Sequence, residues 1–213
     1  MTTVILIRHG ESEANREDIF AGHLNVDLMP KGVEQAQKTA QYIVENYTVD
    51  KIYASDLKRA YKTGKTLADK LGMEIIADKR FREIDAGEWD GIKFNELGDK
   101  YAEDFRIWRD DIANAKCTGG ESVEDLRKRV FGAATEVAEN NDGKTVVIAT
   151  HATPIRVMQT YVQMGSLEKM NDIPWVSNAS VSVFEYDNGK WTCKAVSMDK
   201  HLGDLVTALP SNV

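Results

Sequence analysis

The chain has 213 residues, of which 42% are hydrophobic and 29% charged, as in a globular protein with a sizeable core. Its formal net charge of -7 argues against a general nucleic-acid-binding protein, because such proteins carry a basic surface that meets the phosphate backbone. The apolar N-terminal run ends at Ile7 and is too short for a signal-peptide core, and no apolar stretch is long enough to cross a bilayer. We therefore expect a cytoplasmic protein with neither nucleic acid nor membrane as a partner.

The first third of the chain alternates between strand and helix patterns. Val4–Ile7 is continuously apolar and rich in β-branched residues, which predicts a strand buried on both faces. A one-sided apolar stripe at helical spacing predicts a helix over Pro30–Tyr47. The short run Ile52–Ala54 predicts a second strand. Another stripe predicts a helix over Asp56–Leu71, with Ser55 as its N-cap.

The rest of the chain continues this alternation after a polar interval. Residues 90–118 lack a strand pattern and are predicted to form a helical excursion over one end of the sheet. A stripe over Ser122–Ala138 predicts a helix whose N-cap is Ser122. Val146–Ala149 predicts a further buried strand, and Pro154 suits the first turn of a helix that runs to about residue 162.

The C-terminal part predicts an antiparallel hairpin. Ser180–Tyr186 and Trp191–Val196 flank the tight-turn sequence Asp187-Asn188-Gly189. Together the elements predict an α/β fold, a three-layer sandwich in which a mainly parallel central sheet lies between helices. We expect a single domain over residues 1–213, with the excursion as a cap over the site.

Three strand ends carry side chains suited to binding an anion. Arg8 and His9 follow the first strand, Arg59 lies shortly after the second, and His151 follows the strand at 146–149. Ligands of open α/β sheets bind beyond the carboxyl ends of the strands, so we expect these side chains to meet. Two buried arginines beside two histidines are unfavourable unless an anion accompanies them, and arginine forks match phosphate oxygens. The sequence predicts a phosphate site.

Five motifs occur in a recognisable order over nearly the whole chain. They are Leu6–Asn15 (Leu-Ile-Arg-His-Gly-Glu-Ser-Glu-Ala-Asn), Ser55–Thr63, Phe81–Gly91, Gly119–Ser122 and Thr150–Ala152. This set resembles the histidine phosphatase superfamily, which includes the cofactor-dependent phosphoglycerate mutases. A motif set in order is far more specific than any one match.

The resemblance implies catalysis through a phosphohistidine. His9 attacks the phosphoryl group, and Glu83 protonates the leaving oxygen and then activates water; the alternative for Glu83 is a surface carboxylate paired with Arg82. His151 counts as catalytic as well. The implied phosphate-binding groups are the side chains of Arg8, Asn15, Arg59 and His151 and the backbone N–H of Ala152. The resemblance implies no metal and no cofactor.

The rim of the pocket departs from the family pattern. The residues that the resemblance places against the substrate are Ser12, Ala21 and Gly22. Ala152 replaces a frequent glycine but keeps its N–H. Relatives often have a polar residue in place of Ala21, an aspartate in place of Asn25, and a threonine or serine in place of Met29. These differences leave the substrate's identity open.

Other candidate residues are not assigned a catalytic role. Glu121 is expected to be structural and to anchor one of the arginines. His23 and His201 are expected to be non-catalytic, either lining the pocket or solvated. Cys117 and Cys193 fit no zinc pattern, and no function is assigned to them.

The sequence favours a phosphatase over a mutase. Mutases of the family carry a second arginine after the residues that resemble Trp108-Arg109, whereas this chain has Asp110, which would repel a substrate carboxylate. The path to Gly119-Gly120 is shorter than in mutases, and Asn178–Val181 is similar to the phosphatase branch. Lys93 keeps the mutase alternative open.

The sequence thus leaves three functional classes open. The preferred one is a metal-independent phosphomonoesterase with a small phosphorylated metabolite as its partner. The second is a phosphoglycerate mutase, which alone would require 2,3-bisphosphoglycerate as a cofactor. The third is an inactive relative that binds a phosphorylated ligand or a protein. The oligomeric state is open, and a homodimer is compatible with the sequence.

Overall fold

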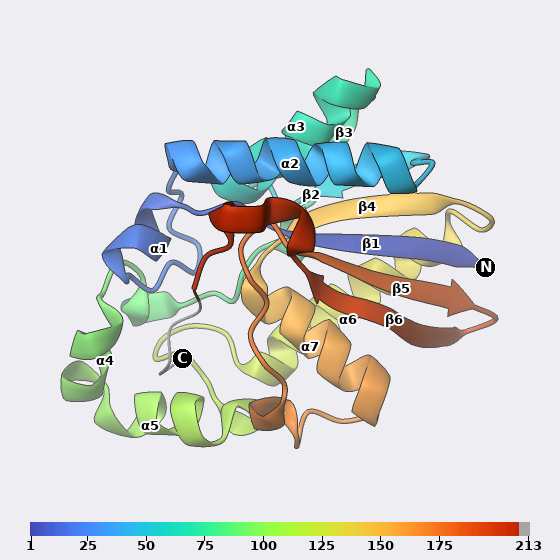
Figure 1. Ribbon diagram of the computed structural model, residues 1–213. Coiled ribbons are helices and arrows are strands. Elements are labelled where there is room, and N and C mark those ends of the chain that lie inside the picture. Colours follow the sequence, from blue (N-terminus) through green and yellow to red (C-terminus); the bar gives the residue numbers. More distant parts are fainter. Residues whose placement is uncertain (209–213) are drawn as a thin grey trace.

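The computed structural model describes residues 1–208 and has a six-stranded sheet at its centre, with the strand order β3-β2-β4-β1-β5-β6 (Figure 1). Four neighbouring strands are parallel to one another: β3 (Ile75–Ala77), β2 (Lys51–Ala54), β4 (Thr145–Thr150) and β1 (Thr2–Arg8). The mainly parallel sheet predicted from the sequence is confirmed.

The C-terminal hairpin adds two strands to the other edge of β1. β5 (Val181–Asp187) pairs antiparallel with β1 and with β6 (Lys190–Met198). Asp187 is opposite Lys190, so Asn188 and Gly189 form a two-residue loop. Both have positive φ, 48° and 80°, as the tight hairpin turn requires. The predicted hairpin is confirmed.

Helices cover both faces of the sheet. α2 (Pro30–Asn46) and α3 (Lys58–Leu71) pack on one face, and α6 (Val123–Glu139) and α7 (Ala152–Met164) pack on the other (Figure 1). Successive residues of a strand point to opposite faces. Accordingly, Ile5 and Ile7 of β1 join the core on the α2–α3 side, whereas Val4 and Leu6 join the core on the α6–α7 side.

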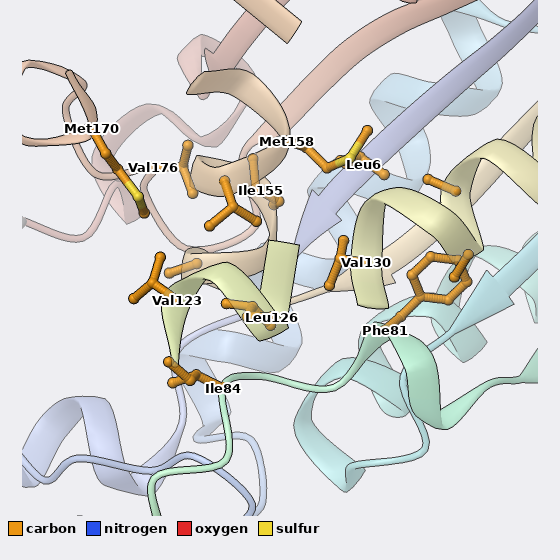
Figure 2. Close-up of a cluster of buried hydrophobic side chains, with 14 of the residues drawn as sticks. Leu6, Phe81, Ile84, Val123, Leu126, Val130, Ile155, Met158, Met170 and Val176 are labelled. Carbon is orange, nitrogen blue, oxygen red and sulfur yellow. The ribbon is translucent and has the colours of Figure 1, made fainter. Parts of the chain in front are cut away.

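The larger core lies on the side of α6 and α7. Figure 2 shows Val130 of α6 and Met158 of α7 near Leu6 of β1. Because β1 and β4 contribute apolar side chains to both cores, their sequences are continuously apolar rather than alternating. This burial holds both strands firmly, and their carboxyl ends are therefore rigid supports for side chains.

Shorter helices gather beyond the carboxyl ends of the strands. α1 (Glu13–Glu17) follows β1, and α4 (Phe94–Lys100) and α5 (Ala102–Asp110) form the predicted excursion (Figure 1). The part of the chain that the structure describes also contains five 3-10 helices: η1 (Lys79–Phe81), η2 (Gly87–Trp89), η3 (Ile112–Asn114), η4 (Met170–Asp172) and η5 (Lys200–Leu205). Within residues 1–208, no helix is long and apolar enough to cross a membrane.

One of the two predicted helix caps is correct. The Ser122 hydroxyl accepts a hydrogen bond from the Asp125 N–H at 3.1 Å and begins α6 as expected. Ser55 is not a cap: α3 begins two residues later than predicted, and its N-cap is Leu57. The Ser55 hydroxyl instead accepts from the Leu57 N–H at 3.3 Å and contacts His151. Sequence analysis also missed the short elements α1 and β3.

Candidate active site

The pairing of β1 with β4 places the two histidines side by side. Arg8 is opposite Thr150 in this parallel pair, and the His9 N–H donates to the Thr150 carbonyl at 2.9 Å. The next residue of each strand is therefore a histidine at the same level. The rings of His9 and His151 meet at 62°, with centroids 5.2 Å apart.

The hydrogen bond of His9 defines which ring nitrogen carries the proton. Nδ1 lies 2.7 Å from the Gly10 carbonyl, which can only accept, so Nδ1 is protonated and Nε2 keeps its lone pair. Close backbone packing fixes this carbonyl: a Cβ on Gly10 would lie 2.3 Å from the Gly32 oxygen. Burial and then the charges of Arg59 and Arg8 hold the pKa of His9 well below 6.5. The ring is thus a neutral base at physiological pH.

Two buried arginines flank this ring. Arg59 is 1% exposed, and its guanidinium donates to the carbonyls of Leu24, Ala21 and Gly22 at 2.7 to 2.9 Å. Arg8 donates from Nη1 to the Val176 carbonyl, and its buried Nε has no partner among residues 1–208. Burial lowers the pKa of each to about 10, so both remain charged at neutral pH.

Asn15 and Ala152 add neutral donors. The Asn15 side-chain oxygen accepts from the N–H and hydroxyl of Ser12, at 3.1 and 3.0 Å, and from the Asn178 amide at 3.1 Å. These donors occupy the oxygen, so the Asn15 NH2 group is the end left to bind an anion. Ala152 is the first residue of α7, where the N–H groups and the helix dipole favour negative charge.

Glu83 is 9% exposed and lies at the same cavity. One carboxylate oxygen accepts from the Ile84 N–H at 2.8 Å and the other from the Thr153 N–H at 3.3 Å. Arg82 does not pair with it, because the Arg82 guanidinium makes two 2.6 Å bonds to Asp56. The alternative in which Glu83 is a surface partner of Arg82 is therefore wrong.

An arginine brace holds the backbone at Glu83. Arg129 of α6 donates to the carbonyls of Arg80, Arg82 and Glu83 at 2.8 to 3.1 Å. Its other bonds, at 2.9 and 2.7 Å, go to the carboxylate of Glu121. Glu121 anchors an arginine as expected, but this arginine is Arg129, which supports the Glu83 segment, and not Arg8 or Arg59 of the site.

His151 lies beneath the surface of the site. It is fully buried, with Nε2 2.9 Å from the Ser55 hydroxyl. That hydroxyl accepts from the Leu57 N–H and can donate its own proton to Nε2; in the tautomer with this bond, Nδ1 carries the ring proton. This Nδ1 is buried without a partner among the described residues. Burial, Arg59 and His9 lower the pKa of His151 well below 6.5.

A cavity opens over these groups and collects most of the predicted residues. It is lined by Arg8, His9, Ser12, Ala14, Asn15, Asp18, Ile19, Phe20, Ala21, Arg59, Glu83, Phe94, Trp108, Ala152, Thr153, Trp175, Asn178, Thr207 and Ala208. Two predicted site residues are not in the lining: His151, which lies behind it, and Gly22, whose carbonyl serves Arg59.

The two remaining histidines also lie outside the lining. A ring nitrogen of His23 is 3.1 Å from the Glu83 carbonyl. His201 stacks on Tyr42, with centroids 4.7 Å apart, and contacts the Thr39 hydroxyl at 2.9 Å. Both are half-buried, so each keeps part of its surface in contact with solvent.

The residues that would favour a mutase do not line the cavity. Arg109 pairs with Asp110 on the surface, with 54% and 47% of their side chains exposed. Lys93 is exposed and does not line the cavity.

The two cysteines are not paired in a disulfide, and burial raises the pKa of each thiol. Residues 1–208 contain no group of three or more side chains suited to holding a metal ion.

Sequence reasoning missed several lining residues. Asp18 follows a five-residue helix that the sequence did not predict, and Trp175 and Thr207 come from irregular segments. Asn178 was noted for its motif but not for its contacts with His9 and Asn15. No periodicity signals such residues; the nearest available sign was the family motif that contains Asn178.

Comparisons with known proteins agree with this arrangement. Phosphoserine phosphatase 1 of Hydrogenobacter thermophilus is 35% identical over 204 residues, which cover 96% of each chain. The solved structure of YhfR from Bacillus stearothermophilus matches with a TM-score of 0.90 at 25% identity, over 95% of this chain and all of that one. A mutant phosphoserine phosphatase from Entamoeba histolytica in complex with phosphoserine matches with a TM-score of 0.84 at 26% identity, over the same shares.

These matches support the prediction of a phosphatase over that of a mutase. The family model described as histidine phosphatase superfamily (branch 1) matches residues 4–199, which is nearly the entire chain. This family match agrees with the fold, since the solved relatives share the same mainly parallel sheet flanked by helices. The chain therefore belongs to the histidine phosphatase superfamily.

Proposed function

We propose that this protein hydrolyses small phosphomonoesters, without a metal, through a phosphohistidine formed on His9. One observation carries the proposal: a neutral imidazole with a free Nε2 lies at a cavity together with two buried, charged arginines. A neutral nitrogen is a competent nucleophile, and the arginines attract the phosphate dianion that it attacks. This electrostatic role is one that a metal ion fills in many other phosphotransferases.

In the first step, His9 Nε2 attacks phosphorus and the bond to the alcohol oxygen breaks. The guanidinium groups of Arg8 and Arg59 stabilise negative charge on the transferring oxygens, and the amide of Asn15 and the N–H of Ala152 bind them as well. Glu83 in its protonated form donates its proton to the leaving alcohol. The proton on Nδ1 of His9 stays bonded to the Gly10 carbonyl, which stabilises the positive ring that forms.

In the second step, water replaces the alcohol. Glu83, now a carboxylate, takes a proton from the water as its oxygen attacks phosphorus, and the bond to Nε2 breaks to restore neutral His9. The two backbone N–H bonds and the Arg129 brace hold this carboxylate in place through both steps. The products are the alcohol and inorganic phosphate.

His151 is proposed as a further phosphate ligand. When Nδ1 carries the ring proton, it is a buried donor without a partner within residues 1–208, which is costly unless a ligand satisfies it. The ring is fully buried beside His9 and does not line the cavity, so a small shift of the cavity wall is required for contact. Ser12 and Ala21, which line the cavity, are proposed to contact the alcohol part of the substrate.

The test is hydrolysis of an aryl phosphate, 4-nitrophenyl phosphate, in the presence of excess chelator. We expect turnover by the wild type and a loss of at least about 10³-fold in His9→Ala. Rapid quenching in base should trap a phosphorylated wild-type protein. This protein should lose its phosphoryl group in acid, as expected for a P–N bond. Metal-dependent turnover, or phosphorylation of the His9→Ala variant under the same quench, would refute the mechanism. Faster interconversion of phosphoglycerates with 2,3-bisphosphoglycerate than hydrolysis would favour the mutase.

A further inference from the structure

The outer part of the cavity has a different chemical character from its floor. We define the outer wall as Asp18, Ile19, Phe94 and Trp175, all of which are half-buried or exposed. The floor is formed by buried Arg8, His9 and Arg59. The outer wall therefore combines apolar and aromatic surface with one carboxylate, whereas the floor is positively charged.

The two sides of the outer wall are each held by contacts with the surrounding structure. The Phe94 N–H donates to the Asp18 carbonyl at 3.0 Å, and Ile19 forms a β-bridge with Lys93. On the other side, Trp175 packs against the guanidinium of Arg156, which lies 4.2 Å from the ring centroid. Arg156 is buried and also holds the carbonyls of Met170 and Ile173.

Asp18 occupies a backbone conformation that glycine adopts with less strain. It ends α1 with φ 54° and ψ 44°, the left-handed region, while its N–H donates to the Ala14 carbonyl. A residue other than glycine there loses some stability, although aspartate tolerates it better than most. A strained residue at a cavity is a reason to ask what its side chain contributes.

The carboxylate of Asp18 has no partner of its own. Among residues 1–208 it makes neither an ion pair nor a side-chain hydrogen bond. Two nearby cations do not line the cavity: Arg16 lies 3.6 Å from Glu17, and Lys93, whose backbone bridges Ile19, is exposed. Among the described residues of the lining, the only cationic side chains are Arg8 and Arg59 of the floor. An unpaired carboxylate beside aromatic rings attracts a positively charged ligand group.

We propose that the outer wall selects phosphomonoesters of amino alcohols, whose leaving group is cationic. Such a molecule carries a phosphate dianion at one end and an ammonium group at the other, which matches a positive floor and a negative outer wall. A leaving group whose only charge is a carboxylate would meet Asp18 and no free cation in the described lining. This inference rests on the proposed phosphatase function and names the substrate class of the same site.

The test compares three substrates with two-carbon alcohols and different charges: phosphoethanolamine, ethyl phosphate and phosphoglycolate. Their intrinsic reactivities differ, so the informative quantity is how a substitution changes the ratio of their kcat/KM values. Asp18→Asn removes the charge and keeps a residue that tolerates the left-handed region. We expect the ratio for phosphoethanolamine over phosphoglycolate to fall about tenfold, the order expected for an exposed charge acting on two opposite charges.

Two further variants sharpen the comparison. Asp18→Lys should lower the ratio further by favouring phosphoglycolate. Glu17→Gln removes a neighbouring carboxylate that does not line the cavity, and the ratio should change less than twofold. Added salt should shrink the difference between wild type and Asp18→Asn because it screens exposed charges. Circular dichroism and thermal unfolding confirm that each variant is folded.

The outcomes separate the two proposals. If 4-nitrophenyl phosphate is hydrolysed but the ratio is the same in wild type and Asp18→Asn, the amino-alcohol inference is wrong and the phosphatase function stands. A higher ratio in Asp18→Lys than in wild type would overturn the inference as well. If the wild type hydrolyses none of the four esters, the phosphatase function fails and the inference falls with it.

Discussion

The rings of His9 and His151 lie edge to face, with centroids 5.2 Å apart, although 142 positions separate them in the chain (from residue 9 to residue 151). This contact follows directly from the register in which Arg8 faces Thr150. Neither ring can accept a proton readily in this setting. Both are buried, and the charges of Arg59 and Arg8 oppose protonation of each. The site thus holds two neutral imidazoles in a positive field, which is suited to an anionic substrate.

The first prediction concerns stability against pH. The pKa values of His9 and His151 are lower in the folded protein than in the unfolded chain, where they are near 6.5. As pH falls through 6.5, the unfolded chain binds protons that the folded protein does not, so the free energy of unfolding decreases. The slope is about 1.4 kcal/mol per pH unit for each such histidine, and it ends when the folded-state pKa is reached.

Urea unfolding at pH 7.5, 6.5 and 5.5 measures this effect. Carboxylates remain mostly ionised over this interval, so they contribute little to the change. The decrease between pH 6.5 and 5.5 should be smaller in His9→Ala by about one proton's contribution, roughly 1 kcal/mol. Equal slopes in the two proteins would show that His9 titrates normally, in conflict with its burial beside the arginines.

The second prediction assigns Glu83 through the leaving group. Glu83→Gln keeps the size of the side chain but cannot donate or accept the reacting proton. Hydrolysis of an alkyl phosphate should slow by about 10²- to 10⁴-fold, because an alkoxide leaves poorly without a proton. Hydrolysis of 2,4-dinitrophenyl phosphate, whose alcohol leaves unaided, should lose far less in a burst measurement of the first step. A uniform loss on both substrates would contradict the general-acid role.

The third prediction concerns the Arg129 brace. Arg129→Met leaves the partly buried Glu121 carboxylate and three carbonyl groups without this donor. We expect a loss of about 3 kcal/mol in the free energy of unfolding, as for a broken buried pair. The matched control is Glu136→Gln, which removes an exposed partner of Arg80 and should cost less than about 1 kcal/mol. Chemical denaturation compares the two; similar small losses would mean that the brace is not structural.

The fourth prediction uses two glycines in contrasting surroundings. A Cβ on Gly10 would lie 2.3 Å from the Gly32 backbone oxygen, so Gly10→Ala must move the segment that holds His9. We expect a loss of about 3 kcal/mol or more in stability. Gly72 ends α3 with φ +66° in open space, so Gly72→Ala should cost only about 1 kcal/mol, for the left-handed conformation. Thermal unfolding of both variants measures this, and a larger loss in Gly72→Ala would contradict it.

Much of the fold followed from patterns that are local in the chain. Continuous apolar runs mark β1 and β4 because both faces of these strands are covered, and one-sided stripes mark α2, α3 and α6 because only one face is. The short elements α1 and β3 escaped prediction. α1 has five residues and β3 has three, which are too few to show a hydrophobic period. Contacts with the rest of the fold stabilise both elements.

The sequence by itself determined the chemical groups and the strand ends that carry them: Arg8 and His9 after β1, and His151 after β4. Only the tertiary structure decided how each group is used. It placed His151 beneath the surface, turned the Ser55 hydroxyl from a predicted helix cap to a partner of that ring, and brought Asp18 to the cavity. The reason is physical. Apolar periodicity reports how a segment meets the core, whereas hydrogen-bond partners and unpaired charges depend on which distant segments the packing brings together.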